Sequence, residues 1–432
     1  MRLTRRASGA VVAIAALCLL AQPAAAAATS SPNDPLFSNG DQWALSGAPA
    51  SILAPPAWCS ATGAGVLVAD VDTGVDFSHP DLAGKVVAGA RFTNGDGSLT
   101  GTGQAAVQDD NGHGTMTSGI VAADTNNGKG IAAVAPGARI LAVKVLNSAG
   151  GGSDSDVAAG IEYAISAGAK VINLSIGPDV PLTGVISAIP GAIQDAWNAN
   201  VIVAVAAGNA GIPAASYQSL SSDSLVAGAL GRDATPAYYS NSGVGVNIYA
   251  PGGDESGAAD VQHGVVSTTL GGGYGFAQGT SFAAPQVAGV LALLVGRGMS
   301  AANAWQAVTS SASRRNGFPD LNAAASLGVP ATATCSGAAT ATATPARRPG
   351  AAAPAHGTPS TTPPPPATSA PPGASKPGVT PGVSVGGSGT GASGGSGAGG
   401  IATASGAPAA VGVGLVAVAL GAGAYLVRRR RA

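Results

Sequence analysis

Three short segments of the sequence combine a carboxylate, an imidazole and a hydroxyl group with small neighbouring residues. They are Asp72-Thr73-Gly74, His113-Gly114-Thr115 and Gly279-Thr280-Ser281. A serine hydroxyl becomes a nucleophile when an imidazole takes its proton, and a carboxylate in turn holds that imidazole. Asp72, His113 and Ser281 could supply this chemistry if the fold brings them together.

Each segment also has an ordinary structural explanation. An Asp before Thr-Gly is often a turn residue, a histidine can be structural, and a serine at the start of a helix is often its N-cap. His356 lies in a low-complexity tract, which leaves His79, His113 and His263 as candidates. Glycines flank His113 before a helix-like run over 115–123, so its ring should be reachable at a helix start.

The elements that must position these residues alternate along the chain from Val66 to about Gly328. β-Branched runs predict buried parallel strands, and longer amphipathic stretches predict helices between or after them. This alternation predicts an α/β fold, with a mostly parallel sheet and helices on both faces. Asp72 follows a strand at its carboxyl end, where open α/β sheets place their sites. The expected strands are Val66–Ala69, Ile140–Val143, Val171–Leu174 and Val201–Val205, and the expected helices are Asp154–Ala167, Val185–Ala199, Ser281–Arg297 and Ser300–Ala312.

The first 28 residues predict an export signal. Arginines at positions 2, 5 and 6 precede the apolar stretch Ala10–Ala21, and Ala24–Ala28 offers cleavage sites. A retained membrane anchor is the alternative. Cleavage leaves Cys59 and Cys335 at the two ends of the folded region. Outside the cell this pair is free to oxidise, so we expect either a disulfide or two unpaired thiols.

Charge is distributed unevenly along the chain. All 21 acidic residues lie between Asp34 and Asp320, and residues 29–330 hold only ten basic ones, which gives this span a net charge of −11. Nucleic-acid binding requires a basic surface, so we expect no nucleic-acid partner. An acidic folded region is consistent with an exported module.

Composition changes abruptly after the expected catalytic domain, residues 29–329. Residues 330–408 are rich in Ala, Thr, Pro, Ser and Gly and predict a disordered stalk. Residues 409–427 form an uncharged run of 19 that predicts a single transmembrane helix, and the arginine-rich residues 428–432 predict a cytoplasmic tail. The catalytic region would then be extracellular. A cell-wall sorting signal is the alternative, but it needs an LPxTG-like motif upstream and none is present.

Taken together in the order Asp, His, Ser, the three segments resemble those of the subtilisin-like serine proteases. The resemblance, closest to thermitase-like catalytic domains, runs from Asn33 to about Ala325. It implies a subtilisin-like three-layer fold and hydrolysis of peptide bonds through an acyl-enzyme intermediate on Ser281, with no catalytic cofactor. It also implies that the Asn209 amide, after the expected strand Val201–Val205, stabilises the oxyanion together with the Ser281 N–H.

The same resemblance assigns the walls of a cleft for polypeptide substrates. Gly150, Gly151 and Gly152 would form one wall, and Leu174, Ser175, Ile176 and Gly177 the other, both pairing with the substrate backbone. Asp154 and Asp156 lie beside the first wall, which suggests a preference for basic residues N-terminal to the cut. A Ser hydrolase of small esters would be expected to carry a Gly-x-Ser-x-Gly motif, which is absent around Ser281.

A structural calcium site is also implied by the resemblance. Asp34, Asp81 and Asn127 would supply side-chain oxygens, and Asp124, Lys129 and Ile131 would supply backbone carbonyls. Without calcium, Asp81 would be a turn residue and residues 126–128 a plain loop.

Some positions differ from the family pattern. Subtilases commonly have His-Gly-Thr-His and Ser-Met-Ala-Thr-Pro-His, whereas Met116 ends the first motif here and Gln286 ends the second. Phe282, Ala284 and the expected C-terminal anchor are similar to features of mycosins, the membrane-anchored subtilases of type VII secretion. A structural role in such a secretion complex, with partners there, is therefore the alternative function.

Overall fold

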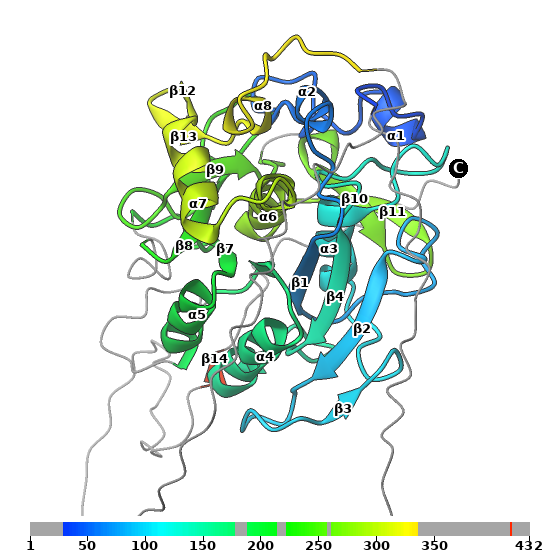
Figure 1. Cartoon of the computed structure of the whole chain (residues 1–432), viewed down its shortest axis with the longest axis vertical. Coiled ribbons are helices and arrows are strands. Elements are labelled where there is room, and N and C mark those ends of the chain that lie inside the picture. Colours follow the sequence, from blue (N-terminus) through cyan, green and yellow to red (C-terminus); the bar gives the residue numbers. More distant parts are fainter. Residues whose placement is uncertain (1–28, 178–187, 214–221, 257–260, 336–414, 417–432) are drawn as a thin grey trace, which may run out of the picture. The chain divides into compact units, whose positions relative to one another are not determined.

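The computed structural model describes residues 29–177, 188–213, 222–256, 261–335 and 415–416 (Figure 1). The expected export signal, nearly all of the expected stalk, the basic tail and all but two residues of the expected membrane helix lie outside this part. Among the described residues, none of the helices is both long enough and apolar enough to cross a membrane.

A ten-stranded sheet forms the centre of the described chain, in the order β12-β13-β9-β8-β7-β6-β1-β4-β2-β3. Its neighbouring strands are parallel except at the two ends, where β2–β3 and β12–β13 are antiparallel. Chain crossovers run to both sides of β1, so its carboxyl end faces the kind of crevice in which α/β proteins bind ligands. The strands are β1 (Leu67–Asp72), β2 (Val86–Arg91), β3 (Gly101–Thr102), β4 (Arg139–Lys144), β6 (Val171–Leu174), β7 (Ile202–Ala206), β8 (Ser224–Leu230), β9 (Ile248–Pro251), β12 (Ser313–Arg315) and β13 (Phe318–Asp320).

Helices and a hairpin complete the fold. The antiparallel pair β10 (Val265–Thr269) and β11 (Gly273–Ala277) packs against α3. The remaining short strands are β5 (Gly152–Ser153) and β14 (Leu415–Val416). The helices are α1 (Pro35–Ser38), α2 (Ala54–Trp58), α3 (His113–Ala122), α4 (Asp154–Ser166), α5 (Ala188–Asn198), α6 (Thr280–Gly296), α7 (Ala301–Ser310), α8 (Ala323–Ser326) and the 3-10 turn η2 (Val261–His263).

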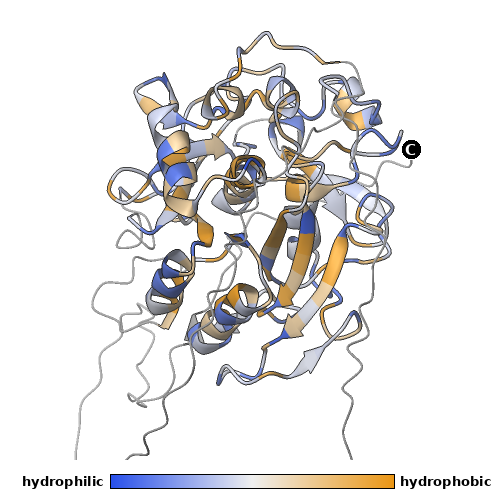
Figure 2. Cartoon of the chain, in the orientation of Figure 1, coloured by the Kyte–Doolittle hydropathy of each residue, from blue (hydrophilic) through white to orange (hydrophobic). Residues whose placement is uncertain are grey.

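The central strands are buried on both faces, which gives the three layers expected from the sequence. Along β1, Val68 packs into a core cluster with α3 and α6, whereas Ala69 and Val71 pack into a second cluster with α4 and α5. Figure 2 shows the strong hydropathy of strands β1 and β4 between these helices. Continuous apolar runs are the pattern expected of parallel strands covered on both sides.

The predicted elements agree with the structure to within a few residues. The run Val171–Leu174 is β6, and the helix expected at Asp154–Ala167 is α4. Ser300 is the N-cap of α7, where its hydroxyl accepts a hydrogen bond from the Asn303 N–H. Strand β8 is not among the predicted elements, because its Gly and Ala residues carry weak strand propensity.

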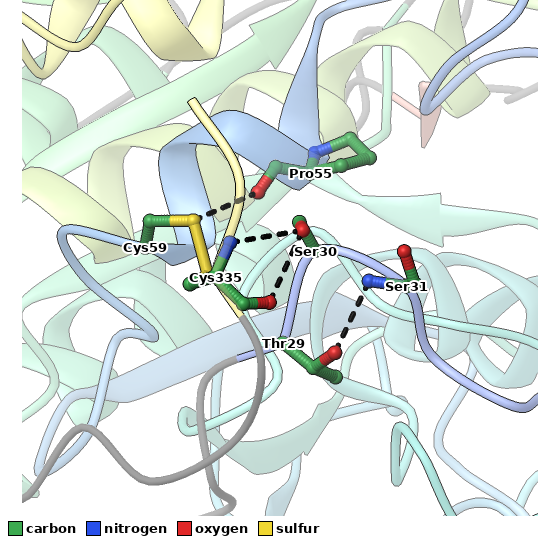
Figure 3. The surroundings of a disulfide bond; sticks show 6 residues. All are labelled: Thr29, Ser30, Ser31, Pro55, Cys59 and Cys335. Carbon is green, nitrogen blue, oxygen red and sulfur yellow. Dashed lines mark hydrogen bonds between the residues drawn. A yellow bond between two sulfur atoms is a disulfide. The ribbon is translucent and has the colours of Figure 1, made fainter. Parts of the chain in front are cut away.

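A disulfide joins Cys59, just after α2, to Cys335 beyond α8, with a Cα–Cα distance of 5.5 Å. Of the two outcomes left open by the sequence, the structure therefore has the disulfide. Ser30 lies beside this bridge, where its hydroxyl and N–H donate to the Cys335 carbonyl (Figure 3). The bridge thus holds the beginning of the described chain and the end of its folded region side by side.

Candidate active site

The carboxyl group of Asp72, the last residue of β1, holds the imidazole of His113, the first residue of α3. The Nδ1 atom of His113 lies 2.8 Å from Asp72 Oδ1 and 2.9 Å from Oδ2. Asp72 Oδ1 also accepts a hydrogen bond from the Thr73 N–H. Both side chains are buried, so this contact is shielded from water. The Asp72 carboxylate therefore favours the ring tautomer with its proton on Nδ1, which leaves Nε2 as a base.

Close approach of α3 to the end of β1 depends on Gly114. A Cβ atom at this position would collide with the Gly74 carbonyl oxygen and lie 3.2 Å from the Asp72 Cβ. This lack of space for a Cβ atom explains why a glycine follows His113 in this motif.

Asp109 organises the loop before His113, a role that the sequence analysis missed. Its Oδ1 accepts hydrogen bonds from the N–H groups of Asn111 and Gly112 and from the Thr73 hydroxyl. Its Oδ2 accepts from the N–H and hydroxyl of Thr115. Asp109 therefore fixes the start of α3 relative to β1. The sequence signal was an Asp four residues before the histidine, in a turn rich in Asn and Gly.

Ser281 lies in the first turn of α6 and is 8% exposed. Its hydroxyl donates to the Ser175 carbonyl at 3.1 Å, and the Ser175 hydroxyl donates to the Ser281 carbonyl at 2.8 Å. Pro285 explains why that carbonyl is available, because a proline four residues on has no N–H to donate to it. The serine thus has a fixed neighbour at the carboxyl end of β6.

The Nε2 atom of His113 is buried and has no hydrogen-bond partner among the described residues. The structure therefore joins Asp72 to His113 by hydrogen bonds and shows no hydrogen bond from His113 to Ser281. The imidazole packs against Phe282, the residue after Ser281, with ring centroids 5.8 Å apart. This contact places the histidine ring against the start of α6.

Two opposing effects act on the pKa of His113. Burial disfavours the charged ring, but the charge and hydrogen bond of Asp72, with the charges of Asp70 and Asp109, outweigh it. The net effect raises the pKa of His113 above its ordinary value. The imidazolium that forms when this ring takes up a proton is therefore stabilised by the carboxylates behind it.

Asn209 follows β7 and contacts the start of α6. Its Oδ1 accepts hydrogen bonds from the N–H and the hydroxyl of Thr280, both at 2.9 Å. Because a backbone N–H can only donate, the atom that faces it must be the oxygen, so the amide nitrogen points away from Thr280. This contact fixes the orientation of the carboxamide beside Ser281.

The two segments expected to form the walls of the substrate cleft lie in different surroundings. Ser175 contacts Ser281 directly, as described above, whereas the side chains of Leu174 and Ile176 are buried in the core. On the other side, Asn147 shapes the glycine turn by donating its N–H to the Gly151 carbonyl and accepting from the Gly151 N–H. Gly152 belongs to β5, and Gly177 is the last described residue before position 188.

Comparison with known proteins identifies the family. Residues 63–329, more than half of the chain, match the model of the subtilase family, Peptidase_S8. The chain belongs to the subtilase family. It is therefore a subtilisin-like serine endopeptidase, and subtilases need no cofactor for catalysis.

Several characterised proteins are similar to this subtilase. Thermitase of Thermoactinomyces vulgaris is 41% identical over 286 residues, which is 66% of this chain and 93% of thermitase. A thermophilic serine proteinase of Bacillus sp. (strain AK1) is 40% identical over 263 residues, 60% of each chain. A solved protease structure from Pseudoalteromonas arctica PAMC 21717 superposes with a TM-score of 0.61 at 32% identity and covers 69% of this chain and 98% of that one.

The side chain of Asp156 does not lie open to a substrate. Its carboxylate accepts hydrogen bonds from the N–H groups of Gly95 and Gly97, and the Ser153 hydroxyl caps the same turn of α4 by accepting from the Asp156 N–H. The Asp156 carboxylate thus holds the loop before β3, and the preference for basic substrate residues beside Asp154 and Asp156 stays a prediction.

The expected calcium ligands of this subtilase come together where residues 33–36 meet the loop 124–131. The Asp34 carboxylate accepts hydrogen bonds from the N–H groups of Asn126 and Asn127. The Asp81 carboxylate accepts hydrogen bonds from the Asn127 amide, the Ile131 N–H and the Tyr274 hydroxyl. The Asp124 N–H donates to the Asp81 carbonyl, and the Lys129 N–H donates to Asn127 Oδ1. In the part of the chain that the structure describes, no three His, Cys, Asp or Glu residues are grouped so as to hold a metal.

The chemistry of this loop nevertheless fits a hard cation. Burial and the nearby charge of Asp81 raise the pKa of Asp34 to about 6. Neither carboxylate takes part in an ion pair within the described ranges. Two buried carboxylates, a carboxamide and backbone carbonyls are the oxygen donors that Ca²⁺ prefers. A cation here would offset the repulsion between Asp34 and Asp81.

Proposed function

We propose that this subtilase is an exported endopeptidase in which Ser281 is the nucleophile, His113 the general base and acid, and Asp72 the residue that orients the imidazole. The observation that carries the proposal is the buried Asp72–His113 contact, with the unpartnered Nε2 atom of the ring beside the helix of Ser281.

The reaction begins with a small change at the serine. Rotation of the Ser281 hydroxyl away from the Ser175 carbonyl would turn its proton toward His113 Nε2. Oγ then attacks the scissile carbonyl carbon while Nε2 takes the proton. Collapse of the tetrahedral intermediate breaks the C–N bond, and Nε2 returns the proton to the leaving amine. Water repeats the two steps on the acyl-enzyme and releases the acid product.

Asn209 would stabilise the oxyanion that forms in both steps. Its oxygen is held by Thr280, so its NH₂ group is turned away from Thr280 and can donate to the intermediate. The Ser281 N–H, in the first turn of α6, would supply the second donor. Fixed donors need no reorganisation during the reaction, which is why such sites are effective.

Labelling of the purified full chain by a fluorophosphonate tests this proposal. The wild-type protein should form a stable covalent adduct on Ser281, and Ser281→Ala should form none. His113→Ala should label far more slowly, because the hydroxyl would lose its base. Equal labelling of Ser281→Ala and wild type, or no labelling of either, would refute the assignment.

We also propose that the loop around Asp34 and Asp81 binds a structural calcium ion. Side-chain oxygens of Asp34, Asp81 and Asn127 would hold it, with the carbonyls of Asp124, Lys129 and Ile131. When bound, the ion would neutralise two buried carboxylates. Calcium should raise the unfolding temperature of wild type over that in EDTA, and should raise that of Asp81→Asn much less. An equal response of the two proteins would exclude this site.

The C-terminal segment supports a further part of the proposal, a membrane tether. Residues 409–427 are uncharged and precede four arginines, a pattern typical of a span with a cytoplasmic tail. The catalytic domain would then act on exported polypeptides outside the cell. Fractionation should place the full chain in the membrane and a chain ending at residue 408 in the medium.

A structural role in a secretion complex remains the second candidate, because Phe282, Ala284 and the C-terminal pattern resemble those of mycosins. The comparison of a gene deletion with Ser281→Ala separates the two functions. A protease function requires that the two strains share the same defect, whereas a structural function requires that Ser281→Ala behaves as wild type.

A further inference from the structure

A second buried carboxyl group, that of Asp70, lies behind the Asp72–His113 pair. Asp70 is two residues before Asp72 on β1, so both side chains point to the same face of the strand. It is only 1% exposed, and no ion pair in the described ranges includes it. A buried carboxyl group without a cationic partner is costly, and its presence requires an explanation in terms of its contacts.

On one side, Asp70 contacts the helix that carries His113. Its Oδ2 accepts hydrogen bonds from the Ser118 hydroxyl at 2.6 Å and from the Thr117 hydroxyl at 2.8 Å. Both residues lie in α3, within two turns of His113, and both are buried. Asp70 therefore ties α3 to the strand that ends in Asp72.

On the other side, Asp70 begins a chain of contacts that ends at the nucleophile. Its Oδ1 accepts from the Asn173 amide at 2.8 Å, and the same amide donates to the Ser175 hydroxyl at 2.9 Å. The Ser175 hydroxyl donates to the carbonyl of Ser281, the one left free by Pro285. These groups are all buried, so water does not compete for the contacts.

We propose that Asp70 is a positioning residue of this active site: it joins the strand of Asp72 to the helix of His113 and, through Asn173 and Ser175, to the helix of Ser281. This inference rests on the proposed function. It adds a fourth residue, which touches no substrate but sets the relative positions of Asp72, His113 and Ser281. Asp70 also contributes negative charge behind the imidazole.

That charge links Asp70 to the pH dependence of the reaction. Burial and the charge of Asp72 raise the pKa of Asp70 to about 7, against the effect of its three hydrogen-bond donors. The Asp70 charge in turn raises the pKa of His113. Because Asp70 is itself protonated as the pH falls below about 7, its charge acts on His113 in the upper part of the acid limb. Removing the charge should therefore shift that part of the limb to lower pH.

Few other ionisable groups face this part of the site. Beyond His113, α3 contributes none, and neither do β6 and α6. The acidic residues of α4 lie on the opposite face of β1 from this site. Among the residues that the structure describes, the other charged groups near this site are Asp72 on β1, Asp109 before α3, and Lys144 at the end of β4, whose ammonium binds Asp110 and the Thr73 carbonyl.

The test is the pH profile of kcat/KM for the Asp70→Asn full chain, since asparagine keeps the size of the side chain and removes its charge. The acid-limb midpoint should fall by roughly half a pH unit, and kcat should fall several-fold while KM changes less than twofold. Asp320→Asn is the matched control, because it makes the same change in a buried carboxyl group five strands away, and its profile should equal that of wild type.

Ser118→Ala provides a milder variant in case Asp70→Asn does not fold. It removes one hydrogen bond to the carboxylate, so it should move the midpoint in the same direction by a smaller amount. An unmoved midpoint in every variant that folds, whether activity is normal or uniformly reduced at all pH values, would overturn the inference. Failure of wild type to react with a fluorophosphonate would instead refute the proposed function, so the two failures are distinguishable.

Discussion

At the centre of the sheet, the carboxyl group of Asp72 binds His113 and the Thr73 N–H, whereas near one edge the equally buried Asp320 has no hydrogen-bond partner of normal geometry among the described residues. Asp320 ends β13 and is 2% exposed. Burial raises its pKa to about 6, although the charge of Arg315 partly opposes this.

The difference shows that residue type and burial do not distinguish a functional carboxyl group from a destabilising one. The partners distinguish them. At the centre, desolvation of Asp72 is offset by contacts that orient a base. At the edge, desolvation of Asp320 is only a cost to the native state. We therefore expect changes at the centre to alter rates, and changes at the periphery to alter stability.

The largest effect is expected at the centre, for Asp72→Asn. The carboxamide cannot stabilise the imidazolium and favours the wrong tautomer, so kcat should fall by about 10⁴-fold with little change in unfolding temperature. In wild type the acid limb of kcat/KM should have its midpoint above about 6.5, because the pKa of His113 is raised and the base is lost as the ring is protonated. Steady-state assays across pH check both. Retention of more than a tenth of the activity by Asp72→Asn would contradict the comparison.

Asn209 combines the two kinds of role, because its oxygen holds the start of α6 and its NH₂ group is proposed to stabilise the oxyanion. Its replacement by Ala should lower kcat by about 10²–10³-fold, the range known for subtilisin. Asn209→Asp keeps an acceptor for Thr280 but has no N–H to offer the oxyanion, so it should be as slow as Asn209→Ala. If Asn209→Asp had wild-type kcat, the residue would act only by holding α6.

Removal of the disulfide between Cys59 and Cys335 tests the expectation for the periphery of the molecule. The double change to serine removes a bridge that spans 276 residues and should reduce the free energy of unfolding by about 2–4 kcal/mol. Denaturant unfolding measures this loss, with unreduced wild type as the reference. Below the unfolding transition kcat should be unchanged, because the bridge lies outside the site. A fall in kcat without a fall in stability would contradict the expectation that changes at the periphery alter stability and not rate.

The smallest effect, and the only gain, is expected for Asp320→Asn. A pKa raised in the folded state means that Asp320 stabilises the protein least above pH 6, when it must be charged, and most below about pH 4, when it is protonated in both states. Asparagine avoids the buried charge, so unfolding at pH 8 should cost about 1 kcal/mol more. The gain should vanish by pH 4. A variant less stable than wild type at pH 8 would show that Asp320 has a favourable partner.

Much of the fold and the site could be predicted from local patterns. The β-branched runs give β1, β4, β6 and β7 because strands buried on both faces need them, and the Asp72, His113 and Ser281 segments can be recognised from their small neighbours. The Asp109 contacts and the Asp70 network could not be predicted, because their partners lie up to 106 residues apart in the chain. No local pattern encodes such a distance.

The sequence by itself determined which residues of this subtilase could do chemistry and which segments would form the layers that hold them. Only the tertiary structure decided that Asn209 turns its oxygen to Thr280, that Asp156 is used by a loop, and that Cys59 meets Cys335. The physical reason is that hydrogen bonds and disulfides form over a few ångströms. The order of strands in the sheet sets which distant residues come within that range.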